Sequence, residues 1–392
     1  MQFRKSFPLI VAALALTSCA SPTVAEPTPH GYVEGAAEAS EPQLHLAAVG
    51  ADGSLTLIDL LDEQQKTIGV LDVAADVSTN GRYVFAATNT GVTIADSGVW
   101  TVDHEDHFHY YRAEPRIIGT VAGDGVAQVA SDTLATTVSF ANETVVLDSE
   151  KLGEGEIVEL ARIASDGMAA PLGKTVVVAH DGELRSYDLD GTATGTAHAC
   201  DDPAGTITTR VGVVIGCTAG AVLYTGDFEL VAYPRGTAAS DRAVEFDNRA
   251  GRPTVAAVAG TAGYWLLDTR ERTWSRVDSP ELREVAAVDD REGHVVAIAA
   301  DGRLLVFDAS GEQVAATDRL DATEPLDATE PLDATEQLDA TEQLGATGAL
   351  AVDATRAYVN ASGVVYEIDF ADGARIAREF AIDAAFVVET GR

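Results

Sequence analysis

Residues 46–59 read Leu46-Ala-Ala-Val-Gly-Ala-Asp-Gly53-Ser-Leu-Thr-Leu-Ile-Asp59. Two apolar runs flank an Asp-Gly pair, and the second run ends at an aspartate. Asp-Gly is typical of tight hairpin turns, because glycine accepts the positive φ that such turns require. The stretch therefore predicts two short antiparallel strands joined by a turn at Gly53.

Seven further copies of this pattern follow along the chain. Their turns lie around Gly91, Glu143, Gly182, Gly220, Gly263, Gly302 and Gly363. Counted from Gly53, the intervals are 38, 52, 39, 38, 43, 39 and 61 residues. A period near 40 with several short strands per unit is typical of propeller blades. We expect an all-β fold, a β-propeller of about eight blades, or seven if one hairpin is an excursion.

The first and last strands of the repeat are expected to lie side by side in one blade, as in a closed ring. The chain enters at Gln43 in the position of a blade's second strand, and it ends with a lone apolar strand at residues 384–389. We expect this last strand to complete the first blade and close the ring, which would remove an exposed sheet edge. Residues 43–392 are therefore predicted to form a single propeller domain.

The 61-residue interval contains a tandem hexapeptide, Leu-Asp-Ala-Thr-Glu-Pro, with Gln replacing Pro in later copies. Removing the 24 residues 320–343 returns the interval to 37 residues. The repeat cannot bury an apolar face, so residues 320–347 are predicted to form a disordered acidic surface loop. Calcium binding is the alternative, but calcium loops place a glycine at the bend and this repeat has none.

The first residues have the pattern of an export signal. Arg4 and Lys5 precede an apolar stretch from Phe7 to Leu16, which is followed by Thr17-Ser18-Cys19. This pattern predicts a lipoprotein signal peptide at 1–18 with lipidation of Cys19, or alternatively an ordinary secretory signal. Residues 19–42 are rich in Pro, Ala, Glu, Ser and Thr and are predicted to be a tether. We expect an exported protein held at the cell membrane only by its lipid anchor.

The charge balance restricts the partners. Asp and Glu number 62 against 26 Lys and Arg, a formal net charge of −36. Nucleic-acid binders and proteins that adhere to anionic lipid need basic surfaces, so both classes are excluded. A carboxylate-rich surface instead attracts cations. We expect a monomer.

Cys200 and Cys217 remain after the predicted processing, 17 residues apart. A disulfide persists outside the cytoplasm, and we expect these two cysteines to pair. Metal ligation by the two thiols is the alternative, but no Cys-x-x-Cys spacing supports it.

The 52-residue interval contains an insertion at residues 99–116 with the run Asp103-His104-Glu-Asp106-His107-Phe-His109-Tyr-Tyr-Arg. Imidazole and carboxylate groups are ligands of zinc and its neighbours. On an extended strand, His107 and His109 point to the same face, and His104 can approach across the turn. Phe108 and Tyr110 would then point the other way, into a core.

The insertion is therefore predicted to bind Zn²⁺, with nickel, cobalt and Cu(II) as alternatives, or to be a solvated turn. His30, near the end of the tether, either completes the site or is a plain linker residue. Structural or exposed roles are expected for the other histidines: His45, His180, His198 and His294.

Three segments carry a family resemblance: residues 98–119, 29–35 and 293–302. They resemble the AztD-like family of periplasmic zinc metallochaperones, over the chain from about residue 29 to the end without the hexapeptide loop. The resemblance implies a β-propeller that binds zinc and delivers it to the solute-binding protein of a zinc ABC transporter. By the motif match, His104, His107 and His109 would be the zinc ligands. The chain differs from the family at residues 201–206, which stand where a His-Gly-Glu element is expected.

Two other functions remain open from the sequence. One is a metal-dependent, lactonase-like hydrolase using Glu105, Asp106 or Glu114 beside the metal. No Ser-His-Asp or Gly-x-Ser-x-Gly constellation supports nucleophilic catalysis, so an enzyme is not expected. The other is a metal-free propeller that serves as an interaction platform.

Overall fold

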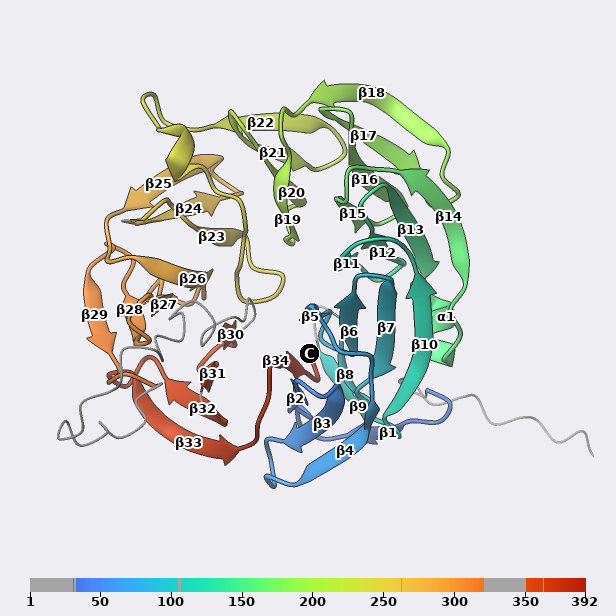
Figure 1. Ribbon diagram of the computed structural model, residues 1–392, viewed down its shortest axis with the longest axis vertical. Coiled ribbons are helices and arrows are strands. Elements are labelled where there is room, and N and C mark those ends of the chain that lie inside the picture. Colours follow the sequence, from blue (N-terminus) through green and yellow to red (C-terminus); the bar gives the residue numbers. More distant parts are fainter. Residues whose placement is uncertain (1–30, 32, 105–106, 262, 321–349, 362) are drawn as a thin grey trace, which may run out of the picture.

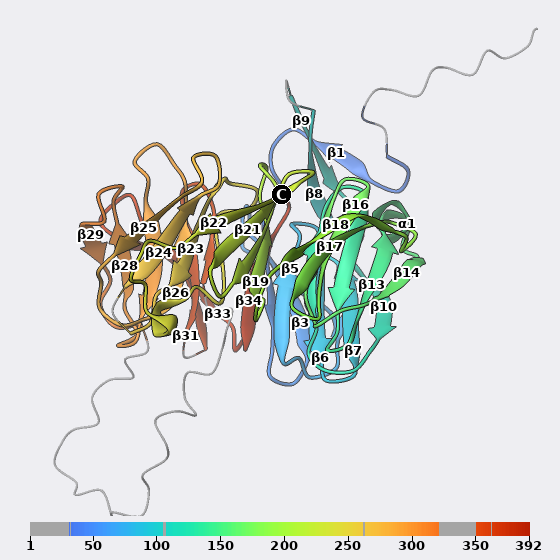
Figure 2. The same ribbon diagram turned by 90° about the horizontal axis from the view of Figure 1, so that it is seen from above.

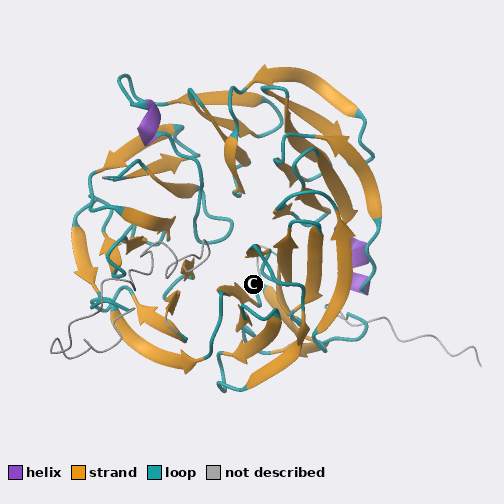
Figure 3. Cartoon of the chain, in the orientation of Figure 1, coloured by secondary structure: helices purple, strands orange, loops and turns teal. Residues whose placement is uncertain are grey.

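The computed structural model of the chain describes residues 31, 33–104, 107–261, 263–320, 350–361 and 363–392. Regular structure is almost entirely β-strand (Figure 3), with short helices at Ser149–Glu154 (α1) and Ala239–Asp241 (η1). Within the described residues, eight sheets stand in a ring as the blades of a propeller (Figure 1). One further small sheet, which contains an inserted hairpin, is described below. The predicted all-β propeller is confirmed, with eight blades. No helix in these described ranges is long and apolar enough to cross a membrane.

Each blade is an antiparallel sheet whose strands follow one another from the inside of the ring to its outside. In this order, blade 1 contains β34 (Phe386–Thr390), β2 (His45–Val49), β3 (Ser54–Asp59) and β4 (Gln65–Val70). Blade 2 contains β5 (Asp76–Thr79), β6 (Tyr83–Thr88), β7 (Gly91–Asp96) and β10 (Arg116–Ala122). Blade 3 contains β11 (Gln128–Ser131), β12 (Ala135–Ser139), β13 (Glu143–Asp148) and β14 (Glu159–Ala164). Blade 4 contains β15 (Ala169–Leu172), β16 (Thr175–His180), β17 (Glu183–Asp188) and β18 (Ala193–Ala199).

The second half of the ring repeats this arrangement. Blade 5 contains β19 (Ala204–Thr208), β20 (Val213–Cys217), β21 (Gly220–Tyr224) and β22 (Phe228–Ala232). Blade 6 contains β23 (Thr254–Val258), β24 (Tyr264–Asp268) and β25 (Thr273–Val277), and a bridge joins Asp247 to the inner side of β23 at Ala256. Blade 7 contains β26 (Leu282–Ala287), β27 (Val295–Ala299), β28 (Leu304–Phe307) and β29 (Gln313–Ala316). Blade 8 contains β30 (Leu350–Val352), β31 (Ala357–Ala361), β32 (Val364–Asp369) and β33 (Arg375–Ala381).

The last strand completes the first blade, as predicted. β34 pairs antiparallel with β2, so that Leu46 lies opposite Glu389. Leu46 and Ala48 of blade 1 also belong to one buried cluster with Tyr358 and Phe380 of blade 8. The C-terminal strand therefore completes the sheet of blade 1, and blades 1 and 8 pack against each other through this cluster.

The blades are held by apolar packing between their faces. Every residue of β2 is buried, whereas the outer strand β4 is mostly exposed and begins with three polar residues. Inner strands are covered on both faces by neighbouring blades, which explains their Ala and Val runs. The turn at Gly53 has φ +82°, and a Cβ there would lie 2.2 Å from the carbonyl oxygen of Leu71, so this position requires glycine.

Two domain boundaries differ from expectation. Ala37–Ala39 form strand β1 inside the predicted tether, because they pair with an inserted strand described below. Leu320, the first residue of the predicted acidic loop, is buried between blades 7 and 8. The rest of that loop through residue 347, the signal peptide and Cys19 lie outside the described residues.

Candidate metal centre

The histidine insertion is a β-hairpin that stands on one face of the ring (Figure 2). β8 (Val99–Asp103) and β9 (Phe108–Arg112) replace the direct link between β7 and β10 of blade 2. They pair antiparallel, with Val102 opposite His109, and β1 adds a third strand on the other side of β9. The sequence forms strands here because aromatic and β-branched residues predominate on both sides of the turn.

The base of the hairpin is fixed to the propeller by charge and aromatic contacts. Arg82 donates to both carboxylate oxygens of Asp96, at 2.8 and 3.1 Å. Its guanidinium also lies 3.8 Å from the ring centre of Trp100, a cation–π distance. The hydroxyl of Thr101 donates to the carbonyl of Gly391 at 2.6 Å, which joins the hairpin to the C-terminal end.

The two faces of β9 have different environments. His109 and Tyr111 are buried, their rings 6.1 Å apart, and Tyr111 stacks on Trp100 at 5.1 Å. On the opposite face, Phe108 stacks on Tyr110 at 6.3 Å and is 53% exposed. The expectation that Phe108 and Tyr110 enter a core is wrong, because the hairpin stands above the ring and only one of its faces is covered.

The three predicted histidines come together at the tip. The ring centres of His104 and His107 are 5.2 Å apart, and each lies within 5.0 Å of the ring centre of His109. The Nε2 atoms of His107 and His109 are 3.0 Å apart. Two nitrogens bound to one tetrahedral Zn²⁺ are about 3.4 Å apart, so this spacing fits a shared ion with little movement. The backbone NH of His104 donates to the carbonyl of His107 at 3.0 Å and closes the turn.

A carboxylate from the N-terminal segment orients His109. Oε1 of Glu38, on β1, lies 2.6 Å from Nδ1 of His109. Histidines that bind metals commonly hydrogen-bond a carboxylate through the other ring nitrogen, which fixes the tautomer and raises ligand basicity. This bond directs Nε2 of His109 toward His107. Sequence reasoning missed Glu38, because its only signal was a glutamate in a segment with the composition of a tether.

The same segment covers the buried side of the hairpin. The hydroxyl of Tyr111 donates to the carbonyl of Gly31 at 2.8 Å. Burial, and then the negative charge of Glu38, raise the pKa of Tyr111, so its hydroxyl remains protonated and able to donate. A Cβ on Gly31 would lie 2.6 Å from the His109 ring, so backbone at this position packs directly on the imidazole.

The structure describes only some of the other residues that the sequence suggested for the site. Asp103 ends β8 and is exposed, one residue before His104. Asp106, Glu105 and His30 lie outside the described residues. Glu114 forms an exposed ion pair with Lys66 of β4, with its Oε1 2.6 Å from Nζ.

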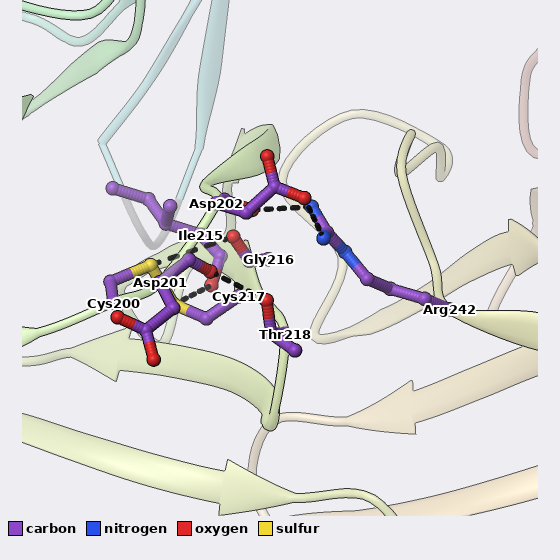
Figure 4. The surroundings of a disulfide bond; sticks show 8 residues. All are labelled: Cys200, Asp201, Asp202, Ile215, Gly216, Cys217, Thr218 and Arg242. Carbon is purple, nitrogen blue, oxygen red and sulfur yellow. Dashed lines mark hydrogen bonds and ion pairs between the residues drawn. A yellow bond between two sulfur atoms is a disulfide. The ribbon is translucent and has the colours of Figure 1, made fainter. Parts of the chain in front are cut away.

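The predicted disulfide between Cys200 and Cys217 is present and buried, and it links the end of β18 to β20 (Figure 4). Asp202, in the segment that differs from the AztD-like pattern, forms an ion pair with Arg242. Figure 4 shows its carboxylate beside the Arg242 guanidinium, close to the disulfide.

Fold and site together define an eight-bladed β-propeller with a three-histidine hairpin on one face. Two solved structures share this fold closely: "Crystal structure of Citrobacter koseri AztD" and "Structure of apo AztD from Citrobacter koseri". Each has a TM-score of 0.72 and 16% identity, over 89% of this chain and 98% of that one. The computationally designed Ika8 protein is also similar, with a TM-score of 0.52 and 14% identity over 82% of this chain and 91% of its own.

No family model matches the chain, and no curated protein matches it. At 16% identity the likeness to AztD establishes the fold, and this chain is AztD-like in that sense. The resemblance expected from the histidine segment thus has a structural counterpart over most of the chain.

Proposed function

We propose that this chain is an extracytoplasmic zinc metallochaperone, which carries Zn²⁺ in the hairpin and delivers it to the solute-binding protein of a zinc ABC transporter. The convergence of the three imidazoles, with Nε2 of His107 and His109 at 3.0 Å, carries this proposal. His104, His107 and His109 would bind the ion. We propose that Asp103, Asp106 and His30 complete its coordination.

The exposure of the site supports a carrier that releases its ion. His104 and His107 are exposed, whereas His109 is buried and oriented by Glu38. A partner could therefore replace two of the three imidazoles without unfolding the hairpin. The hairpin also stands above the ring face, where an acceptor protein can reach it (Figure 2).

The likeness to AztD and the absence of thiolates from the cluster favour zinc delivery over other cargo. Imidazole with carboxylate suits zinc, whereas Cu(I) prefers sulfur ligands. The net charge of −36 would raise the local concentration of cations. We further propose a monomer that is not an enzyme, does not bind nucleic acid, and is attached to the membrane only through lipid at Cys19.

A transfer experiment tests the delivery step. Zinc-loaded protein is mixed with a purified zinc-free solute-binding protein of a zinc ABC transporter from the same cell, in excess EDTA. Direct delivery predicts that zinc reaches the acceptor faster than it dissociates into EDTA from the carrier alone. Zinc that enters EDTA at the same rate with or without the acceptor would contradict delivery.

A further inference from the structure

A second group of metal-ligating side chains lies on blade 7. One ligand atom each from Asp290, Glu292 and His294 lies within 4.8 Å of the others. These residues form the connection between β26 and β27. The sequence pattern alone predicts a structural or exposed role for His294.

This group lies on the same face of the ring as the histidine hairpin. Strands alternate in direction within each blade, so the first-to-second and third-to-fourth connections emerge at the same end. Asp290–His294 belong to the first kind of connection in blade 7, and the hairpin replaces the second kind in blade 2. Both groups are therefore open to the same side.

The ligand atoms are held in place by the protein itself. The His294 ring lies with its Nδ1 2.6 Å from Oδ2 of Asp290, while Oδ1 of Asp290 accepts the backbone NH of His294 at 2.8 Å. The ring of Phe370 from blade 8 packs on the imidazole edge-on, with the centres 5.6 Å apart. The side chains of His294 and Asp290 are only 11% and 16% exposed, so their geometry is largely fixed before any ion arrives.

A surface hollow of about 420 Å³ adjoins these groups. Its polar lining consists of Glu292, His294 and Asp308, and its apolar lining includes Val314 and Phe370. No Lys or Arg is among the described residues that line it. A hollow with two carboxylates and an imidazole, and no compensating base, favours a cation over an anion or a neutral ligand.

We propose that Asp290, Glu292 and His294 form a second Zn²⁺ site, separate from the hairpin and independent of the delivery function. One nitrogen and two oxygens belong to the zinc ligand set, and ligands about 2.0–2.2 Å from the ion are about 3.4 Å apart. An ion shared by all three groups needs two adjustments. Nδ1 of His294 and Oδ2 of Asp290, which are 2.6 Å apart, must separate by about 1 Å. The longest spacing, of up to 4.8 Å, must shorten by about 1.4 Å, which rotation of the exposed Glu292 side chain can supply. Asp308 or water would take the fourth position.

A third group, Asp166, His180 and Asp181, provides a matched comparison. It also has ligand atoms within 4.8 Å, but both of its carboxylates are exposed and the His180 side chain is 42% exposed. Ordering exposed side chains around an ion costs conformational entropy, so this group should bind zinc much more weakly. His180→Ala therefore serves as the control for removal of a histidine.

The test begins with full-length protein carrying His107→Ala and His109→Ala, which removes the hairpin site. Zinc titration with chelator competition should still detect one bound Zn²⁺ per chain. Adding Glu292→Gln or His294→Ala should weaken that binding by more than about tenfold, whereas His180→Ala should not. In crystals soaked with zinc, anomalous scattering should place an ion between Asp290, Glu292 and His294.

The proposal is overturned if the hairpin variant retains no zinc, or if Glu292→Gln and His294→Ala leave the retained zinc unchanged. Glu292 is exposed, so its variant should fold normally even if His294→Ala does not. Failure of the hairpin proposal would show instead as unchanged tight binding after loss of His107 and His109, so the two failures are distinguishable.

Discussion

Nδ1 of His109 lies 2.6 Å from Oε1 of Glu38, although 71 residues separate them in the chain. This contact joins the N-terminal segment to the metal-binding hairpin through β1 and β9. It sets the direction of the one buried imidazole in the cluster, and it makes the affinity of the site depend on a residue outside the histidine motif.

Replacing Glu38 with alanine should weaken zinc binding about 10–100-fold, because the His109 ring loses the group that orients it. Competition with a zinc chelator measures the effect. Glu34→Ala is the matched control, since it removes a carboxylate from the same segment at an exposed position. Equal losses from the two variants would mean that net charge, and not the contact with His109, sets the affinity.

Gly31→Ala should also weaken zinc binding, because the new Cβ would lie 2.6 Å from atoms of the His109 ring. Gly35 is the control: its φ is +78° against +84° for Gly31, but nothing lies within 4 Å of a Cβ there. Both substitutions carry the backbone strain of positive φ, so only the steric contact differs. If Gly35→Ala reduces zinc affinity as much as Gly31→Ala does, the packing of Gly31 on the imidazole has no role.

The sequence was sufficient for the ring but not for the whole site. Turns such as Asp52-Gly53 can be recognised from neighbouring residues alone, and their regular spacing predicts the blades. The same holds for His107 and His109, since alternation along a strand places them on one face. Glu38 could not be found this way, because its contact depends on where a distant segment folds back. Phe108 was misplaced because its apolar character indicates burial, while the hairpin leaves that face uncovered.

Removing the disulfide should reduce stability without affecting zinc binding. Cys200 and Cys217 close a loop of 17 residues, so Cys200→Ala with Cys217→Ala should lower the free energy of unfolding by about 3 kcal/mol. Urea denaturation followed by circular dichroism measures this. The hairpin belongs to blade 2, whereas the disulfide joins the end of blade 4 to blade 5. A large loss of zinc affinity in the folded double variant would therefore contradict their independence.

Asp247 should make stability depend on pH. Burial raises its pKa from 3.8 to about 8, with Glu284 and Glu245 adding to the shift and the backbone NH of Asn248 opposing it. Between these values the folded chain holds a proton that the unfolded chain has lost, so stability decreases as the pH rises through this range. Asp247→Asn should remove this loss.

The midpoint of thermal unfolding, compared between Asp247→Asn and the unmodified protein, measures this difference. The advantage of the variant should grow from pH 5 to pH 8 and level off above that. A constant difference across the whole range would show that Asp247 does not bind a proton in the folded state.

We propose that His107 and His109 hold the zinc that the protein carries. Calorimetric titration of the full chain with zinc should show two bound ions, the tighter one at the hairpin. The double variant His107→Ala, His109→Ala should lose this tighter site, keep the ion on blade 7, and still unfold cooperatively with heat. The variant His198→Ala, whose ring stacks on Phe228 of blade 5, should keep the tight site. Tight binding at unchanged affinity in the double variant would contradict the assignment of the hairpin as the zinc site.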